Sequence, residues 1–171
     1  SLRLYDRVSF HLPPFHLDAV LEQRSPFCLV AYKSDEKFHP RFWNKYNAKN
    51  WSQRLSGGAV VEDIGACIWN FRENKLDYYI GILKQDAKGD LYGTTTLTIA
   101  GGLYALFQTP PSTSFNFVNT IQKTWDYIGT VWLPENGYER TGGFEFESYI
   151  EKSRKFSEKI YIPIQRKEER T

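Results

Sequence analysis

The 171-residue sequence has no methionine, only three histidines and two cysteines, and no long uninterrupted apolar run. The chain begins with Ser1 instead of Met, so we expect a domain excised from a longer protein. No segment approaches the roughly 18 apolar residues that a membrane-spanning helix needs, and no signal-peptide pattern is present. These absences favour a cytoplasmic domain without a membrane anchor.

Side chains that bind metals or act as nucleophiles are scarce. His11, His16 and His39 show no ligand-like spacing, and Cys28 and Cys67 lie far apart in apolar, strand-like segments. No Ser or Cys nucleophile has a recognisable His partner. We therefore expect no metal, no cofactor and no acyl-transfer site, and we expect both thiols to be free.

The charge distribution argues against a nucleic-acid-binding surface. The formal net charge is only +2, and Lys and Arg are interspersed with acids along the chain. Residues 165–171 hold the densest basic run, but its signs are mixed, so we expect a solvated tail. Specific binding of duplex DNA by this chain alone is not expected.

Aromatic residues, in contrast, are abundant. Tyr, Phe and Trp make up 16% of the chain, with 11 Tyr, 12 Phe and 5 Trp. This excess fits an aromatic-lined cavity or an aromatic core, and composition alone does not choose between them.

Hydrophobic periodicity predicts a similar order of elements in the two halves of the chain. In the first half, 27–83, we expect a strand at 27–33, a helix at 34–55 and strands at 64–70 and 76–83. In the second half, 94–164, we expect strands at 94–100 and 103–109, a helix at about 114–132 and strands at 144–150 and 159–164. Residues 1–26 are expected to form an irregular arm. The predicted fold class is α+β: duplicated βαββ units form an antiparallel sheet with helices on one face and a ligand groove between the halves.

The C-terminal strands carry the sharpest candidate residue, Glu147. Glu147 and Tyr149 alternate with Phe146 and Ile150, so the two pairs face opposite sides of the sheet. A carboxylate in an aromatic cleft is poorly solvated, and a ligand cation would compensate its charge. From alternation alone, a solvated Glu147, or one paired with Lys159, remains the alternative.

Strand alternation also predicts the walls of the groove. We expect the face of Glu147 to be the one that the helices leave uncovered, and to be shared by Tyr149, Tyr161, Tyr79, Trp69 and Phe107. These six residues are the predicted ligand-binding set. The helical tryptophans are expected in the core instead: Trp43, Trp51, Trp125 and Trp132.

Four segments in order resemble the pattern of GyrI-like effector-binding domains: LYALF at 103–107, WLPENGY at 132–138, FESY at 146–149 and IYIPI at 160–164. These domains are similar to the C-terminal domains of AraC-family (Rob-like) transcription regulators and to the ligand domains of multidrug-sensing MerR regulators. The resemblance covers residues 27–164. It implies a duplicated βαββ fold and a groove with an acidic residue, which falls on Glu147 and is followed by Tyr149.

The function that the resemblance implies is binding of a small effector, cationic or aromatic, by part of a bacterial transcription regulator. DNA would then be bound only through a missing N-terminal helix-turn-helix part. Two alternatives stay open. One is a stand-alone GyrI-like hydrolase of small electrophiles, with Glu147 and Tyr149 as catalytic residues. The other is a gyrase-inhibitor-like module that binds a protein. We expect binding rather than catalysis.

Overall fold

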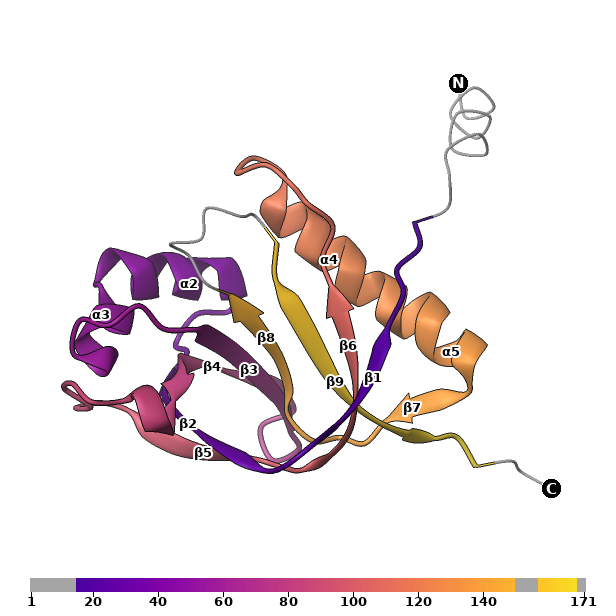
Figure 1. Ribbon diagram of the computed structural model, residues 1–171, viewed down its shortest axis with the longest axis horizontal. Coiled ribbons are helices and arrows are strands. Elements are labelled where there is room, and N and C mark those ends of the chain that lie inside the picture. The colour runs from indigo at the N-terminus through magenta and orange to yellow at the C-terminus, as the bar shows by residue number, and fades with distance from the viewer. Residues whose placement is uncertain (1–14, 150–156, 169–171) are drawn as a thin grey trace.

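The computed structural model describes residues 15–149 and 157–168, and their fold is built on one antiparallel sheet (Figure 1). Its nine strands are β1 (Val20–Arg24), β2 (Phe27–Lys33), β3 (Asp63–Asn70), β4 (Lys75–Leu83), β5 (Thr95–Ile99), β6 (Gly102–Gln108), β7 (Tyr138–Arg140), β8 (Glu145–Tyr149) and β9 (Lys159–Arg166).

The helices fall in two groups. The first group is α2 (His39–Ala48) and α3 (Trp51–Ser56), and the second is α4 (Phe117–Tyr127), the π-helical turn η2 (Ile128–Trp132) and α5 (Leu133–Asn136). A short 3-10 turn, η1 (Lys84–Asp86), follows β4. Pro40 lies in the first turn of α2, where its missing N–H is tolerated. Gly57, with φ of 73°, ends α3 in the left-handed conformation.

The duplication that the sequence predicts is present. The strand order is β1-β6-β9-β8-β3-β4-β2-β5, and β7 pairs with β9 beside this path. Outward from the central β8·β3 pair, the order is β9-β6-β1 on one side and β4-β2-β5 on the other. Each half is therefore a strand–helix–strand–strand unit, which begins with β2 in the first half and with β6 in the second. The outer edge of the first half is β5, and the outer edge of the second half is β1. The α+β class with an antiparallel sheet is confirmed.

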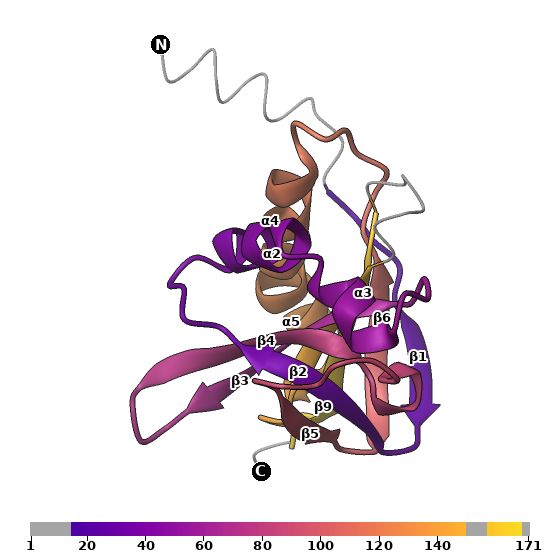
Figure 2. The ribbon, with the colours of Figure 1, turned by 90° about the vertical axis from the view of Figure 1, so that its left-hand side faces the viewer.

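The sheet is strongly curled. Val20 to Arg24 pair with Leu106 to Gly102, and Phe27 to Ala31 continue the same register against Ile99 to Thr95. Residues 20–33, which include β1 and β2, and residues 95–108, which include β5 and β6, thus form two long antiparallel segments that bend together in the middle. Figure 1 shows β1, β2 and β5 curving beneath the central strands, while Figure 2 shows α2 and α4 on the opposite side of the sheet.

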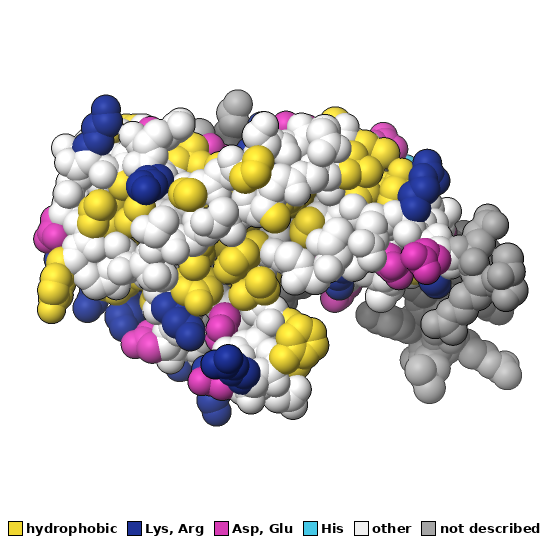
Figure 3. Space-filling model, turned by 90° about the horizontal axis from the view of Figure 1, so that it is seen from below, with side chains coloured by type: hydrophobic (Ala, Val, Ile, Leu, Met, Phe, Trp, Pro, Cys, Tyr) yellow, Lys and Arg dark blue, Asp and Glu magenta, His cyan; other side chains and the backbone are white. Residues whose placement is uncertain are grey.

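The core has three parts. One cluster lies under α4, η2 and α5, with Phe107, Ile160 and Ile162 from the sheet. A second lies under α2 and α3, with Tyr78, Ile80 and Ile82 from β4. The third, which includes Leu29, Ile99, Tyr104, Phe146 and Tyr161, lies on the other face, where the curled sheet covers itself. On the surface seen from below, apolar side chains are interspersed with charged ones (Figure 3).

Several predicted boundaries are wrong. Residues 20–24, expected in an irregular arm, form β1 and pair with β6, whereas residues 1–14 lie outside the described residues. The helix expected at 34–55 begins at His39 and breaks at Asn50, whose φ of 53° is left-handed. Residues 165 and 166 belong to β9, not to the tail, and residues 169–171 and Ile150 are outside the described residues.

Candidate functional site

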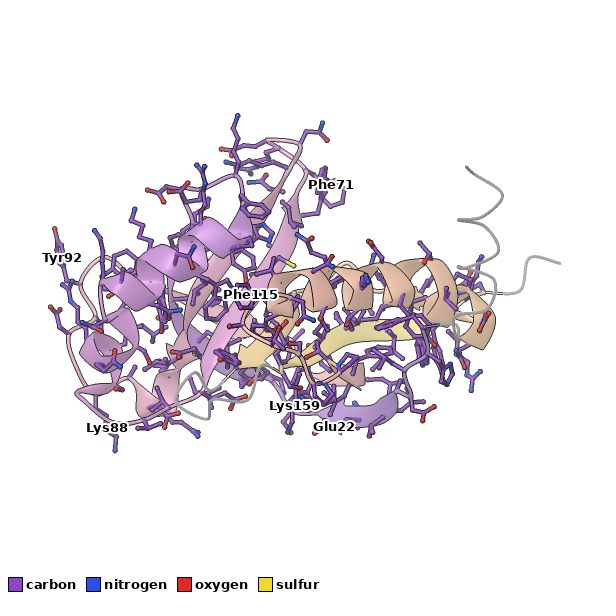
Figure 4. The ribbon with its side chains drawn as sticks, turned by 90° about the horizontal axis from the view of Figure 1, so that it is seen from above. Glu22, Phe71, Lys88, Tyr92, Phe115 and Lys159 are labelled. Carbon is purple, nitrogen blue, oxygen red and sulfur yellow. The ribbon has the colours of Figure 1, made fainter. Side chains whose placement is uncertain are left out.

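A cavity of about 480 Å³ separates α2 from α4. The two helices lie over the same face of the sheet but belong to different halves (Figure 2), so the strands between them are left partly open. In the view from above, Phe115 projects beside this gap from the loop that leads into α4 (Figure 4). The wall on the α2 side includes Phe38, His39 and Trp43, the α4 wall includes Phe117, Ile121 and Trp125, and the floor is Glu147, Tyr149 and Glu158.

The carboxylate of Glu147 is held at the floor by neutral donors. Its side chain is buried, and its Oε1 accepts hydrogen bonds from the hydroxyl of Tyr78 and from Nε1 of Trp43 at 3.2 Å. The same Trp43 Nε1 lies 2.6 Å from the Tyr78 hydroxyl oxygen. Burial and the charge of Glu147 raise the pKa of Tyr78 well above its usual value, so Tyr78 remains a donor. Among the described residues, no Lys or Arg forms an ion pair with Glu147.

Gly65 makes room for this arrangement. It lies directly opposite Glu147 in the β3·β8 ladder. A Cβ at this position would collide with the Tyr78 hydroxyl and would lie 2.9 Å from Glu147 Oε1 and 3.0 Å from Trp43 Cζ2. The missing side chain therefore allows the phenol, the indole and the carboxylate to meet at one point under the cavity.

A second carboxyl group, that of Glu158, lies beside the first. Glu158 is only 4% exposed, and its backbone is fixed by Thr109, with hydrogen bonds of 2.8 Å from Thr109 N to Glu158 O and from Glu158 N to Thr109 Oγ1. Its carboxyl group is hydrogen-bonded to Glu147, and its Oε1 has no hydrogen-bond partner. Burial, together with the charge of Glu147, raises the pKa of Glu158 well above its usual value.

His39 closes the cavity on the α2 side. Its ring stacks on Tyr78 with a centroid separation of 3.9 Å and an interplanar angle of 6°. Burial lowers the pKa of His39, and the charge of Glu147 opposes that shift without reversing it. The lowered pKa favours a neutral imidazole at pH 7, which leaves the net charge of the pocket floor negative.

The structure brings together only two of the six predicted ligand residues. Glu147 and Tyr149 line the cavity. In the sheet, Tyr161 lies directly opposite Phe146, and Tyr79 and Phe146 both lie opposite Ala66. Because residues opposite one another share a face, both tyrosines lie on the face of Phe146 and not on the face of Glu147. The prediction that they share its face is wrong.

The remaining two predicted residues lie on the face of Glu147 but not in the cavity. Phe107 is fully buried in the core against Trp132, with ring centroids 5.2 Å apart. Trp69 lies towards the far end of β3 and is 43% exposed. The expectation that the helices leave the face of Glu147 uncovered is also wrong, because α2 and α4 cover that face on either side of the cavity.

Trp43 and Trp125, which we expected in the core, are only partly buried: they pack against the edges of two core clusters and also line the cavity. In α2 the buried positions are 42 and 46, whereas 39, 43 and 47 form an adjacent stripe that faces the cavity. In α4 the stripe 117, 121 and 125 likewise lies beside the buried positions 124 and 127. The sequence signal that could have identified this cavity wall was the width of the apolar and aromatic faces of α2 and α4, which is greater than packing against the core requires.

The described part of the molecule offers no alternative centre for metals or thiols. No group of three His, Cys, Asp or Glu side chains within it could hold a metal ion. Both cysteines are free and half-buried. Burial and the nearby Glu145 raise the pKa of Cys67 to about 12, so its thiolate is scarce at pH 7. None of the described helices is long and apolar enough to cross a membrane.

Comparison with known proteins gave one family and a set of solved structures. A family model described as GyrI-like small molecule binding domain matches residues 30–165. No curated protein matched the chain.

Three of the solved structures are informative about the fold. The structure of SAV2435 bound to tetraphenylphosphonium has a TM-score of 0.66 at 18% identity and covers 86% of this chain and 94% of its own. The C-terminal domain of EcmrR has a TM-score of 0.59 at 12% identity, covering 89% and 99%. EcmrR in a complex with DNA has a TM-score of 0.62 at 11% identity, covering 96% of this chain and 63% of its own. At these identities the likeness shows a shared fold.

Proposed function

Because the chain belongs to the family of GyrI-like small molecule binding domains, we propose that the cavity between α2 and α4 is its ligand site and that the ligands are lipophilic organic cations. The observation that carries this proposal is the floor of the cavity. Two buried carboxyl groups, Glu147 and Glu158, lie there without a Lys or Arg ion-pair partner among the described residues. A buried carboxylate gains from a cation that replaces its lost hydration.

The walls suit the same class of ligand. Trp43, Trp125, Phe117 and Tyr149 present aromatic rings to the cavity. A cation over an aromatic face gains about 0.5–2 kcal/mol, and flat or phenyl-bearing groups gain further from apolar burial. A cavity of about 480 Å³ is within the range of drug-sized ligands. The neighbour SAV2435 was solved with tetraphenylphosphonium, a cation of this kind.

We further propose that the domain is the effector-sensing part of a bacterial, cytoplasmic transcription regulator that binds DNA through another domain. The support is the likeness in fold to EcmrR, which was solved in a complex with DNA. A ligand wedged between α2 and α4 contacts both halves of the duplicated fold, so its binding energy can favour one relative arrangement of the halves.

The location of the site is tested by a pair of tryptophan variants. We expect Trp125→Leu to weaken tetraphenylphosphonium binding about three- to tenfold, because leucine keeps apolar bulk but removes the aromatic face. Trp69→Leu is the matched control, since Trp69 is 43% exposed and outside the cavity. Isothermal titration calorimetry measures both. A loss of affinity in Trp69→Leu with none in Trp125→Leu would show that the ligand binds outside this cavity.

A further inference from the structure

The two carboxyl groups on the cavity floor are not equivalent. Glu147 Oε1 accepts from Tyr78 and Trp43, both neutral donors that stabilise a carboxylate. Glu158 is 4% exposed, is hydrogen-bonded to Glu147 through its carboxyl group, and leaves Oε1 without a partner. Both side chains line the cavity. The geometry therefore holds the negative charge on Glu147 and provides an acceptor oxygen on Glu158 that the described residues leave unused.

Two ionised carboxylates in hydrogen-bond contact repel each other strongly when water is excluded, so such pairs retain one proton between them. The burial of Glu158 and its contact with Glu147 both raise the pKa of Glu158, in agreement with the geometry. In the protonated state, the hydroxyl of Glu158 donates to the carboxylate of Glu147.

Among the residues that the structure describes, the groups that face Glu158 do not supply a compensating positive charge. From the α2 side these are Lys37, which is exposed at the rim, and His39, whose pKa is lowered by burial. From β4 comes the neutral phenol of Tyr78, and from β8 come Glu147 and Tyr149. The side chains that α4 contributes to the lining are all neutral. Gln108 at the end of β6 and Thr109, the residue after it, lie next to the Glu158 backbone.

We propose that Glu158 is a second charge partner, which is protonated in the free protein and releases its proton to water when a dication enters the cavity. The inference rests on the proposed function, since it concerns the same site and its ligands. A monocation neutralises Glu147 and leaves the proton on Glu158. A dication leaves one positive charge uncompensated, and ionisation of Glu158 neutralises that charge. The pocket therefore exchanges one proton for each dication and distinguishes ligands by their number of charges.

The test counts protons with ligands that cannot titrate. The dication is 1,1′-dimethyl-4,4′-bipyridinium, and N-methyl-4-phenylpyridinium is a monocation of nearly the same shape. Calorimetric titrations at pH 7 in buffers of different ionisation enthalpy give the number of protons released. We expect close to one proton for the dication and close to zero for the monocation. Between pH 6 and 8 the dication affinity should rise by up to tenfold per pH unit, and the monocation affinity should stay nearly constant.

Glu158→Gln identifies the source of the proton. This variant should release no proton with the dication and should lose the preference for the dication over the monocation. If wild type binds both ligands but releases equal numbers of protons with each, the inference is wrong while the proposed function stands. If Glu158→Gln still releases the proton, another group such as His39 supplies it and the inference is again wrong. If wild type binds neither cation, the proposed function itself fails. The wild-type proton count decides the matter even if the variant does not fold.

Discussion

Replacement of Glu147 by glutamine should weaken tetraphenylphosphonium binding about 10- to 100-fold, a change of about 1–3 kcal/mol. Glutamine keeps the shape of the side chain, and its amide oxygen can still accept from Tyr78 and Trp43. What is removed is the negative charge at the cavity floor. The melting temperature should stay the same or rise, because the variant deletes a buried charge that has no cationic partner among the described residues.

The matched control is Glu145→Gln. Glu145 lies two residues earlier on the same face of β8, but it pairs with Arg140 at 3.0 Å and does not line the cavity. Calorimetry should show an affinity close to wild type for this variant. If Glu147→Gln instead lowered the melting temperature by many degrees, Glu147 would be a structural residue, and the loss of binding would have to be explained by unfolding.

The second large effect is expected for Gly65→Ala. The added Cβ collides with the hydroxyl of Tyr78 and comes within 3.0 Å of Trp43 Cζ2, so the contacts that hold Glu147 must open. We expect ligand affinity to fall at least tenfold and the free energy of unfolding to fall by about 1–3 kcal/mol, as in other overpacked cores. Thermal melts and calorimetric titration measure the two effects separately.

Gly129→Ala controls for the removal of a glycine as such. A Cβ at Gly129 meets only the guanidinium nitrogens of Arg140, at 3.7 Å and beyond, which is ordinary van der Waals contact. This variant should bind like wild type and be at least as stable. Normal binding by Gly65→Ala would contradict the claim that Tyr78 and Trp43 position the carboxylate.

The fold could be predicted from the sequence because its signal is local and repeated. Alternation in β8 and β9 and the helical periodicity of α4 gave the correct elements, and their order gave the duplication. β1 was missed because five residues, VLEQR, carry little alternation and become a strand only by pairing with β6. The break at Asn50 was missed because a single left-handed residue leaves no periodic trace.

The site was harder to predict, because alternation separates the two faces of a sheet without showing which one the helices cover. The face with Phe146 and Tyr161 is apolar enough to suggest helices above it, yet the curled sheet covers it with Leu29, Ile99 and Tyr104. That reversal put Tyr79 and Tyr161 in the predicted groove. Strand register decides which residues lie opposite one another, and Tyr161 lies opposite Phe146, not opposite Glu147.

Glu158 could not be found in this way. It precedes β9 by one residue, outside the alternating run, and its environment depends on Thr109, Glu147 and the helices of both halves. Trp43 and Trp125 were assigned to the core because helical spacing predicts a buried face but not a gap between two such faces. In contrast, strand alternation and the family resemblance together pointed to Glu147 and Tyr149, and both residues line the cavity.

The most direct test of the central claim compares two ions of nearly equal size and opposite charge. Tetraphenylphosphonium and tetraphenylborate present the same four phenyl groups, so apolar burial against Trp43, Trp125 and Phe117 is closely matched. Titration of the wild-type domain with each at the same pH and ionic strength isolates the contribution of charge. We predict that the phosphonium binds at least tenfold more tightly, because Glu147 attracts the cation and repels the anion. Equal affinities, or a preference for the borate, would contradict the assignment of the cavity between α2 and α4 as a cation site.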